Sequence, residues 1–391
     1  MEHNYYRVWT EIDLDAIRSN ILSIEEIYKD VPDLKFCAVI KADGYGHGAV
    51  QIAEYIDDIT DFYAVATLPE AVELRTSGVS KPILILGFLH TGFAPCAIEN
   101  DISLTVFDVQ TAEKLSAAAQ NAGRDVKIHI KIDTGMSRIG FVPDEGLAEK
   151  ILYISHLPGI QIEGIFTHFF SADDDISKDD LASARGQFEK FSRVCKELDE
   201  AGLHIPVKHC SNSAAATRLP GFHMDMVRLG ISIYGLYPSE YVDEIKLTGA
   251  LSMKSHVSMV KTVPAGTTVG YGATFTAERE TVLATIPVGY ADGYMRLLSN
   301  KADVLIGGKR ARIAGRVCMD QFMVDVTDLG PVKEGDEVIL IGKSGEEEIT
   351  ADELAGICGT IGYEFTCQIN KRVPRVYYAG GRLIACRDHF A

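Results

Sequence analysis

The chain has 391 residues, of which 47% are hydrophobic and 24% are charged. This composition is typical of a globular protein, and the length exceeds what one hydrophobic core usually supports, so we expect two domains. The 55 acidic residues outnumber the 38 basic residues and give a net charge of −17. Such an acidic chain lacks the positive surface that nucleic acids and anionic membranes attract, so we expect neither as a partner.

The eight cysteines are scattered along the chain and include no C-x-x-C pair, the spacing typical of structural zinc sites. Several lie in apolar runs, where free thiols behave as small hydrophobic groups. The N-terminal residues lack the apolar segment of a signal peptide, and no apolar stretch approaches the length of a membrane span. We therefore expect a reduced cytoplasmic protein without a metal ion.

The first part of the chain alternates short strand patterns with helical patterns. An alternating segment at 8–14 predicts a strand, and residues 16–28 predict a helix. Eight β-rich runs follow, at 36–40, 62–67, 83–88, 104–107, 126–132, 160–168, 207–210 and 227–234. Helical periodicity lies between most of them, for example at 111–122, 145–155 and 180–201. Eight strand–helix units over about two hundred residues are typical of a parallel (β/α)8 barrel of the TIM type.

The pattern changes after Leu236. From residue 250 onward, alternating strand patterns are separated by glycine-rich turns, and a single helix is predicted at 351–358. These patterns predict a barrel at 12–245 and a mainly β-strand domain at 246–391. We expect a strand within residues 1–11 to pack on the second domain.

The apolar run Phe36–Ile40 predicts a strand buried on both faces, and it ends at Lys41. Burial disfavours the charged form of an amine, so the pKa of Lys41 is expected to fall toward neutrality. A neutral amine attacks carbonyl groups and forms a Schiff base. A single lysine at a strand end more often extends its charge into solvent. Here Gly44, Gly46 and Gly48 follow at once, and glycines allow the backbone to approach a ligand closely.

The active site of such a barrel lies at the C-terminal ends of its strands. Apart from Lys41, these ends carry charged, imidazole, hydroxyl and amide groups on Arg138, His168, Asn212, Ser213 and Arg228. The Ser213 hydroxyl and the backbone at Gly230–Ile231, after strands seven and eight, are typical of a phosphate site. A Schiff-base lysine facing a phosphate site predicts pyridoxal 5′-phosphate (PLP) as the cofactor.

The segment 38–48, Ala-Val-Ile-Lys-Ala-Asp-Gly-Tyr-Gly-His-Gly, resembles the cofactor signature of alanine racemases. These are fold type III PLP enzymes built from a barrel and a β domain. Seven further motifs match in the same order, at 131–140, 212–215, 226–235, 270–272, 287–294, 315–321 and 372–375. On these motifs the chain is identified as a member of this family.

The resemblance implies a two-base racemisation of alanine that yields D-alanine, a peptidoglycan precursor. Lys41 is the implied Schiff-base lysine and one acid–base group. Tyr271 is the other, on the opposite face of the substrate–cofactor adduct, and comes from the partner subunit of a homodimer. A phenol has an ordinary pKa of about 10 and is a poor base at neutral pH. A neighbouring cation would lower that pKa, and we expect His168 to act through a hydrogen bond to Tyr271.

The resemblance also assigns the cofactor contacts. Arg228 is the implied partner of the pyridine nitrogen, and because a guanidinium does not deprotonate, that nitrogen stays unprotonated. This weaker electron sink favours proton exchange over decarboxylation. The remaining cofactor contacts implied are His168, Asn212 and a phosphate-binding set of Tyr45, Ser213, Gly230, Ile231 and Tyr363.

The resemblance assigns three residues to the substrate. Arg138 and the backbone N–H of Met319 from the partner chain are the implied contacts of the substrate carboxylate. Tyr290 narrows the entrance, together with Tyr363. In some relatives the lysine at the position of Lys131 is carbamylated and orients the arginine, and we expect the same modification as a hypothesis for this chain.

Three alternatives differ from alanine racemisation in the substrate, in the reaction or in having no catalysis. A racemase for serine, or one of broader specificity, stays open because a few pocket side chains decide it. A decarboxylase would pair the ring nitrogen with a carboxylate, which Arg228 disfavours. A non-catalytic PLP-binding protein would be built from the barrel alone, and the second domain with Tyr271 argues against it.

Overall fold

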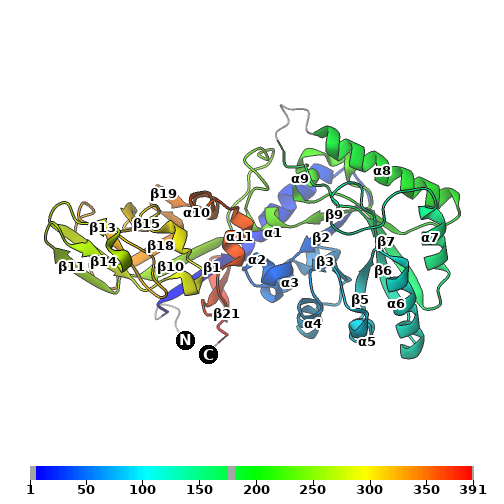
Figure 1. Ribbon diagram of the computed structural model, residues 1–391, viewed down its shortest axis with the longest axis horizontal. Helices are drawn as coiled ribbons and strands as arrows, with labels where there is room; N and C mark the ends of the chain where they lie inside the picture. Colours follow the sequence, from blue (N-terminus) through cyan, green and yellow to red (C-terminus); the bar gives the residue numbers. More distant parts are fainter. Residues whose placement is uncertain (1–5, 175–180, 390–391) are drawn as a thin grey trace. The chain divides into compact units, whose positions relative to one another are not determined.

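The computed structural model in Figure 1 describes residues 6–174 and 181–389. The chain forms two compact units. Unit 1 comprises Met1–Ile17, Tyr45–Gly48 and Thr248–Ala391, and unit 2 comprises Arg18–Gly44 and Ala49–Leu247. Unit 2 contains the predicted parallel barrel and unit 1 the predicted mainly β domain, which confirms the fold class. In the described ranges, no helix has the length and apolar character needed to cross a membrane.

Unit 2 is a closed barrel in which each strand pairs in parallel with the next, and the last pairs with the first. Seven of the eight strands consist mostly of buried residues, because the barrel interior covers one face and helices cover the other. The strands in order are β2 (Lys35–Val39), β3 (Phe62–Val65), β4 (Ile83–Ile85), β5 (Ile102–Val106), β6 (Val126–Lys131), β7 (Ile160–Phe166), β8 (Val207–His209) and β9 (Met226–Leu229).

Helices follow the barrel strands and lie around the outside of the barrel in Figure 1. The helix α6 shows the signals that set such bounds: Asp108 caps its first turn and Gly123 ends it in a left-handed conformation. The α-helices are α1 (Leu14–Glu25), α2 (Lys41–Tyr45), α3 (Ala49–Ile56), α4 (Leu68–Thr76), α5 (Ala94–Glu99), α6 (Val109–Ala122), α7 (Leu147–Ser155), α8 (Leu181–Glu200) and α9 (Ser213–Arg218). Short 3-10 helices are η2 (Glu26–Tyr28), η3 (Asp57–Ile59), η4 (Thr91–Phe93), η6 (Pro220–Phe222) and η7 (Ile231–Tyr234).

Several predicted strands were too long at their C-terminal ends, and the largest error is at 227–234. The run at 227–234 forms β9 only as far as Leu229, and Ile231–Tyr234 turn into the 3-10 helix η7. Gly230 separates them with φ −107° and ψ −106°. A fully buried apolar run shows no periodicity that distinguishes strand from helix, which explains the error. The first residue of the helix predicted at 180–201, and residues 1–5 of the predicted N-terminal segment, lie outside the described part of the chain.

Unit 1 is built on a sheet of eight strands, in the order β16-β15-β18-β10-β1-β20-β21 with β19 paired to β18. The N-terminal strand β1 lies inside this sheet, antiparallel to β10 and parallel to β20. The strands are β1 (Val8–Asp13), β10 (Leu251–His256), β15 (Asp303–Ile306), β16 (Lys309–Arg312), β18 (Glu337–Ser344), β19 (Glu347–Ile349), β20 (Arg375–Ala379) and β21 (Arg382–Arg387).

The rest of unit 1 consists of smaller elements. A three-stranded sheet joins β11 (Met259–Val263), β14 (Thr281–Ile286) and β17 (Phe322–Asp325), and a ribbon joins β12 (Thr268–Val269) to β13 (Phe275–Thr276). The predicted helix at 351–358 is α10 (Ala351–Cys358). A second helix, α11 (Gly362–Cys367), was not predicted, because six residues are too few for a helical period to stand out. Three 3-10 helices are η8 (Tyr271–Ala273), η9 (Tyr290–Asp292) and η10 (Arg296–Leu298).

The segment Tyr45–Gly48 packs within unit 1 through two close approaches of its backbone. A Cβ added to Gly46 would lie 2.2 Å from the carbonyl oxygen of Thr366, and one added to Gly48 would lie 1.8 Å from the hydroxyl of Tyr377. Arg375, which is buried, donates from Nε to the carbonyl of Gly46 (3.2 Å). Glycine is therefore required here by space as well as by backbone conformation.

We predict that Gly48→Ala lowers the free energy of unfolding by about 3 kcal/mol, because overpacking adds to the strain of a positive φ. Gly330 is a matched control, since it has the same φ of +99° but open space where a Cβ would lie. Gly330→Ala should cost about 1 kcal/mol. Urea denaturation of both variants, followed by circular dichroism, gives the comparison, and equal losses would contradict the close approach as the cause.

Candidate active site

Lys41 begins a left-handed turn directly after the first barrel strand. Ala42, Asp43 and Gly44 have φ of +54°, +52° and +61°, and only glycine adopts this region without strain. Side chains of the same unit hold the turn: the N–H of Ala42 donates to Glu70 (2.8 Å), and Asp43 accepts from the N–H of Ala49 (3.0 Å). Strained backbone that is held in this way is common at binding sites.

Arg228 on β9 is the central cation of the barrel mouth, and its side chain is buried. Its Nη1 lies 2.9 Å from Nδ1 of His209, and its Nη2 lies 3.2 Å from Nδ1 of His168. Nη2 also donates to the carbonyl oxygens of Thr167 (3.0 Å) and Cys210 (3.1 Å). All four acceptors are neutral groups. Burial lowers the pKa of Arg228 to about 10, so the guanidinium stays charged at neutral pH.

These contacts fix the protonation of both imidazoles. A guanidinium only donates hydrogen bonds, so Nδ1 of His168 and of His209 must accept, and each ring carries its proton on Nε2. Burial lowers the pKa of both histidines well below the usual range, and the charge of Arg228 lowers it further. The expectation that His168 acts as a cation on Tyr271 therefore needs correction. A neutral His168 can act on a phenol only by donating its Nε2–H.

The network continues into the barrel through residues that the sequence analysis missed. Nε2 of His209 lies 2.9 Å from Nδ1 of His129, and Nε2 of His129 lies 3.0 Å from Glu163. Ser103 donates to the same carboxylate oxygen (2.5 Å). Burial raises the pKa of Glu163, but the hydrogen bonds from His129 and Ser103 outweigh it and lower the pKa. The available signal was a histidine inside a buried strand, since His129 stands two residues before Lys131 and so faces the same side.

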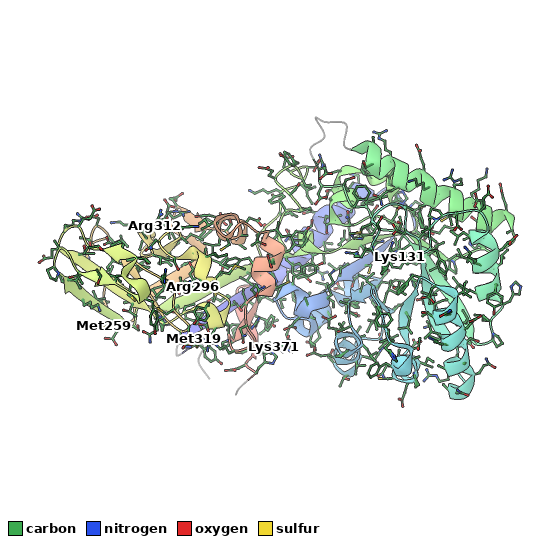
Figure 2. The ribbon with its side chains drawn as sticks, in the orientation of Figure 1. Lys131, Met259, Arg296, Arg312, Met319 and Lys371 are labelled. Carbon is green, nitrogen blue, oxygen red and sulfur yellow. The ribbon has the colours of Figure 1, made fainter. Side chains whose placement is uncertain are left out.

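Lys131, which Figure 2 labels, lies at the end of β6 and is buried. Its Nζ donates to the carbonyl of Ile132 (2.7 Å) and lies 5.4 Å from the centroid of the Phe166 ring. Burial, and then repulsion from Arg228, lower the pKa of Lys131 to about 7. At neutral pH, Lys131 is therefore a neutral amine in a large fraction of the molecules.

The barrel mouth gathers cations in a chain whose net charge is −17. The pKa of His168 is lowered, after burial, by Arg228, Arg138, Lys131 and Lys41 in turn, so four basic groups act on one imidazole. Arg138 is exposed in the loop after β6. A group of mutually repelling cations is stabilised by an anion, and the donors present suit a phosphate or a carboxylate.

Ser213 and Gly230 lie together beside these cations at the ends of β8 and β9. The N–H of Gly230 donates to Oγ of Ser213 (2.9 Å), which leaves the serine O–H to donate elsewhere. Asn212 caps α9 by accepting from the N–H of Ala215 (3.0 Å), and its Nδ2 donates to the carbonyl of Phe169 (3.2 Å). Ile231 begins η7. The predicted phosphate-binding residues of unit 2 are thus adjacent.

The two other predicted phosphate contacts, Tyr45 and Tyr363, belong to unit 1 and contact each other. Their ring centroids are 6.1 Å apart at an interplanar angle of 58°. Tyr45 is buried with φ +52°, and Tyr363 lies on α11. Burial raises the pKa of Tyr45, so its hydroxyl stays protonated and can donate a hydrogen bond.

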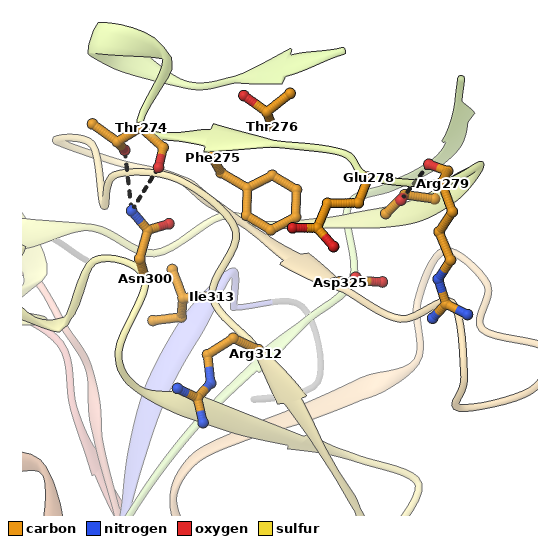
Figure 3. Close-up of a pocket in the computed structure, with 10 residues that line it drawn as sticks. Thr274, Phe275, Thr276, Glu278, Arg279, Asn300, Arg312, Ile313 and Asp325 are labelled. Carbon is orange, nitrogen blue, oxygen red and sulfur yellow. Dashed lines mark hydrogen bonds between the residues drawn. The ribbon is translucent and has the colours of Figure 1, made fainter. Parts of the chain in front are cut away.

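Tyr271 is the most exposed large hydrophobic side chain among the described residues of unit 1, at 72%. Gly270 and Gly272 flank it with φ of +71° and +74°. Asn300 holds the turn: its amide donates to the carbonyl oxygen (3.3 Å) and hydroxyl oxygen (3.2 Å) of Thr274, while its own carbonyl accepts from the N–H of Gly315 (2.6 Å). Figure 3 shows the two bonds from Asn300 to Thr274 at the edge of a pocket of ≈ 670 Å³ lined mostly by polar and charged side chains. The loop geometry presents the phenol outward.

Tyr290 and Met319 are also exposed on unit 1, at 42% and 54%. Two backbone hydrogen bonds join their loops: the N–H of Tyr290 donates to the carbonyl of Cys318, and that of Ala291 to the carbonyl of Met319, both at 3.0 Å. The predicted site residues therefore fall into two sets. Lys41, Lys131, Arg138, His168, Asn212, Ser213, Arg228, Gly230 and Ile231 belong to unit 2, and Tyr45, Tyr271, Tyr290, Met319 and Tyr363 belong to unit 1.

Arg138 acts on His168 but not on His209, and this difference between the two histidines can be tested. Arg138 lowers the pKa of His168 but is not among the groups that lower the pKa of His209. We predict that Arg138→Gln raises the pKa of His168 and leaves that of His209 unchanged. Because Arg138 is exposed, the substitution should not disturb the fold. Proton NMR titration of the imidazole resonances measures both values, and an unchanged His168 or a shifted His209 would contradict the assignment.

Comparison with known proteins agrees with this geometry. The family model described as alanine racemase, N-terminal domain, matches residues 12–238, and that described as alanine racemase, C-terminal domain, matches residues 250–377. An alanine racemase of Clostridium perfringens is 46% identical over 385 residues, covering 98% of each chain. One from Desulforamulus reducens is 47% identical and covers 95% of this chain and 98% of its own.

Solved structures give the same result. The alanine racemase of Clostridium difficile 630 superposes with a TM-score of 0.93 at 40% identity and covers 99% of both chains. The alanine racemase of Bacillus anthracis with bound L-Ala-P superposes with a TM-score of 0.92 at 36% identity, covering 99% of this chain and 98% of that one. Both domains and nearly the whole length are matched, so the chain belongs to the alanine racemase family of amino-acid isomerases.

Proposed function

We propose that this protein interconverts L- and D-alanine with PLP, through Lys41 and a Tyr271 supplied by the partner subunit of a homodimer. The observation that carries the proposal is the buried, permanently charged Arg228 beside two neutral imidazoles. This arrangement suits a ring nitrogen that must remain unprotonated. The family assignment supports the reaction, and the barrel mouth supports the cofactor.

The donors present fit PLP. Lys41 would hold it covalently, Arg228 would donate to its ring nitrogen, and His168 and Asn212 would lie near the ring. Its phosphate would be bound by Tyr45, Ser213, Gly230, Ile231 and Tyr363. When bound, PLP supplies an electron sink that acidifies the Cα–H of an attached amino acid.

Racemisation needs one acid–base group on each face of the substrate Cα. The amine of Lys41 takes or returns the proton on one face, and the phenol of Tyr271 of the partner subunit does so on the other. The exposure of Tyr271, at 72%, supports its use by a second chain. A neutral His168 supports the tyrosine by donating its Nε2–H to the phenolate oxygen, while Arg228 polarises the imidazole from Nδ1.

The substrate carboxylate is bound by Arg138 and by the N–H of Met319 of the partner subunit. Tyr290 narrows the entrance, which favours a small side chain such as that of alanine. The test is to incubate the PLP-loaded protein with L-alanine and with L-serine separately and to follow the D-isomers by chiral chromatography. If L-serine is converted faster than L-alanine, serine becomes the assigned substrate. If the PLP-loaded protein converts neither amino acid, the proposed activity is refuted.

We predict that Tyr271→Phe lowers racemisation in both directions by about 10²–10⁴-fold, the usual contribution of a general acid–base group. Because Lys41 remains, one enantiomer of alanine should still exchange its Cα hydrogen with deuterated water, with retention of configuration. NMR follows the exchange and chiral chromatography follows the inversion. Tyr153→Phe is the control, an exposed tyrosine on the barrel helix α7 that bonds to Glu113. Full racemisation by Tyr271→Phe would contradict the two-base mechanism.

Lys131 has the neutral amine that carbamylation requires. The amine attacks carbon dioxide, an N–C bond forms, and a proton is released to solvent. Because its pKa is about 7, Lys131 is protonated at lower pH and neutral above it, so carbamate should increase as pH rises through this value. The resulting anion would neutralise repulsion among Arg138, Arg228 and Lys41 and orient Arg138.

We predict a carbamate resonance in carbon-13 NMR of the protein in labelled bicarbonate, stronger at about pH 8 than at about pH 6. Lys131→Met, which keeps the apolar stem without the amine, should abolish it. A signal that persists in this variant would place the carbamate on another amine, and no signal at the higher pH would refute the modification.

A further inference from the structure

Asp292 in η9 carries a carboxylate that is completely buried, with 0% of its side chain exposed. Its Oδ1 accepts from Nη2 of Arg7 and from Nε of Arg372 (2.7 Å). Its Oδ2 accepts from Nη1 of Arg7 (3.0 Å) and from the backbone N–H of Gly289 (2.9 Å). Two guanidinium groups and a backbone amide thus saturate the buried anion, and losing any of them would leave charge uncompensated.

This carboxylate connects three motifs that the sequence analysis singled out, at 287–294, 315–321 and 372–375. Arg372 donates to Asp292 and, from Nη2, to Asp320 (2.6 Å), the residue that follows Met319. The backbone N–H of Asn370 donates to the carbonyl of Asp292 (3.1 Å). All these residues belong to unit 1. The loop of Asp292 is therefore tied to the loop of Met319 by side chains as well as by backbone.

The backbone contacts set the direction of one peptide group. The carbonyl of Cys318 and the N–H of Met319 belong to the same trans peptide, in which the two bonds point in opposite directions. Because the carbonyl of Cys318 accepts from the N–H of Tyr290 (3.0 Å), the N–H of Met319 points away from the 289–293 loop. Gly289 permits this approach, since a Cβ there would lie 2.2 Å from the carbonyl oxygen of Met319.

We propose that Asp292 is a positioning residue for substrate: with Arg7 and Arg372 it fixes the 289–293 loop and so aims the N–H of Met319 at the carboxylate of the amino acid. This inference rests on the proposed function, in which that N–H binds the substrate carboxylate. Asp292 would thus favour substrates that carry a carboxylate, from a position in the buried interior of unit 1. Through its hydrogen bond to Asp320, Arg372 also holds the residue that follows Met319.

The test compares Asp292→Asn with Asp303→Asn in the full-length, PLP-loaded protein. Asp303 is a matched control, because it is also a carboxylate of unit 1 with two arginine partners, Arg312 (2.6 Å) and Arg310 (3.7 Å), and both of these arginines lie on β16 rather than in either loop. Two quantities are measured: the kcat and KM for L-alanine, and the dissociation constant of propionate, a carboxylate that lacks the amine and is not turned over.

We expect Asp292→Asn to raise the KM for alanine and the dissociation constant of propionate about ten-fold, the contribution of one hydrogen bond to a charged group, with kcat changed less than about three-fold. Asp303→Asn should leave both near the wild-type values. If Asp292→Asn does not fold, Arg372→Lys replaces it. A lysine keeps the charge but cannot reach Asp292 and Asp320 together, so the KM for alanine and the dissociation constant of propionate should both rise.

Three outcomes would overturn the inference: propionate binding within about two-fold of wild type, an equal rise in Asp303→Asn, or a rise that follows dissociation into monomers in gel filtration. Failure of the proposed function is a separate result. In that case the wild-type protein itself would not racemise alanine, whereas the comparison of propionate binding among the variants would still be readable.

Discussion

The barrel mouth depends on one buried guanidinium. Arg228 makes four hydrogen bonds through Nη1 and Nη2, to two imidazole nitrogens and two backbone carbonyls, and these neutral acceptors leave its charge uncompensated. In the described part of the chain, no carboxylate contacts it directly, and the nearest one in the network, Glu163, lies beyond His209 and His129. Burying a charge in this way is expensive unless an anion is bound, so the same interaction that organises the mouth also prepares it for an anionic ligand.

The charge of Arg228 has different consequences for its neighbours. Burial and, after it, this charge lower the pKa of His168 and His209, so both rings are neutral with their protons on Nε2 and can donate but cannot serve as cations. The same charge also adds to the effect of burial on Lys131, whose pKa of about 7 makes its amine available for reaction. The positive charge of Arg228 therefore favours the neutral, hydrogen-bond-donating forms of His168 and His209 and the neutral, nucleophilic form of Lys131.

Much of the fold could be predicted because the strand–helix alternation and the glycine-rich β patterns are local features of the sequence. The barrel strands were found within a few residues, and the main error, at 230–234, arose where a buried apolar run carries no period. The network from Arg228 to Glu163 could not be predicted in this way. It depends on which side chains of β6, β7, β8 and β9 meet inside the barrel, and periodicity does not show such partners.

The motifs of unit 1 also show a limit of prediction from the sequence. Residue matches at 287–294, 315–321 and 372–375 indicated that these segments matter, but gave no physical reason for Asp292, whose carboxylate was not assigned a role. In the structure, the buried anion needs both Arg7 and Arg372, and Arg372 in turn holds Asp320 beside Met319. A charge that can be buried only when three distant segments meet makes their arrangement all-or-none, which suits a loop that must present one N–H in a fixed direction.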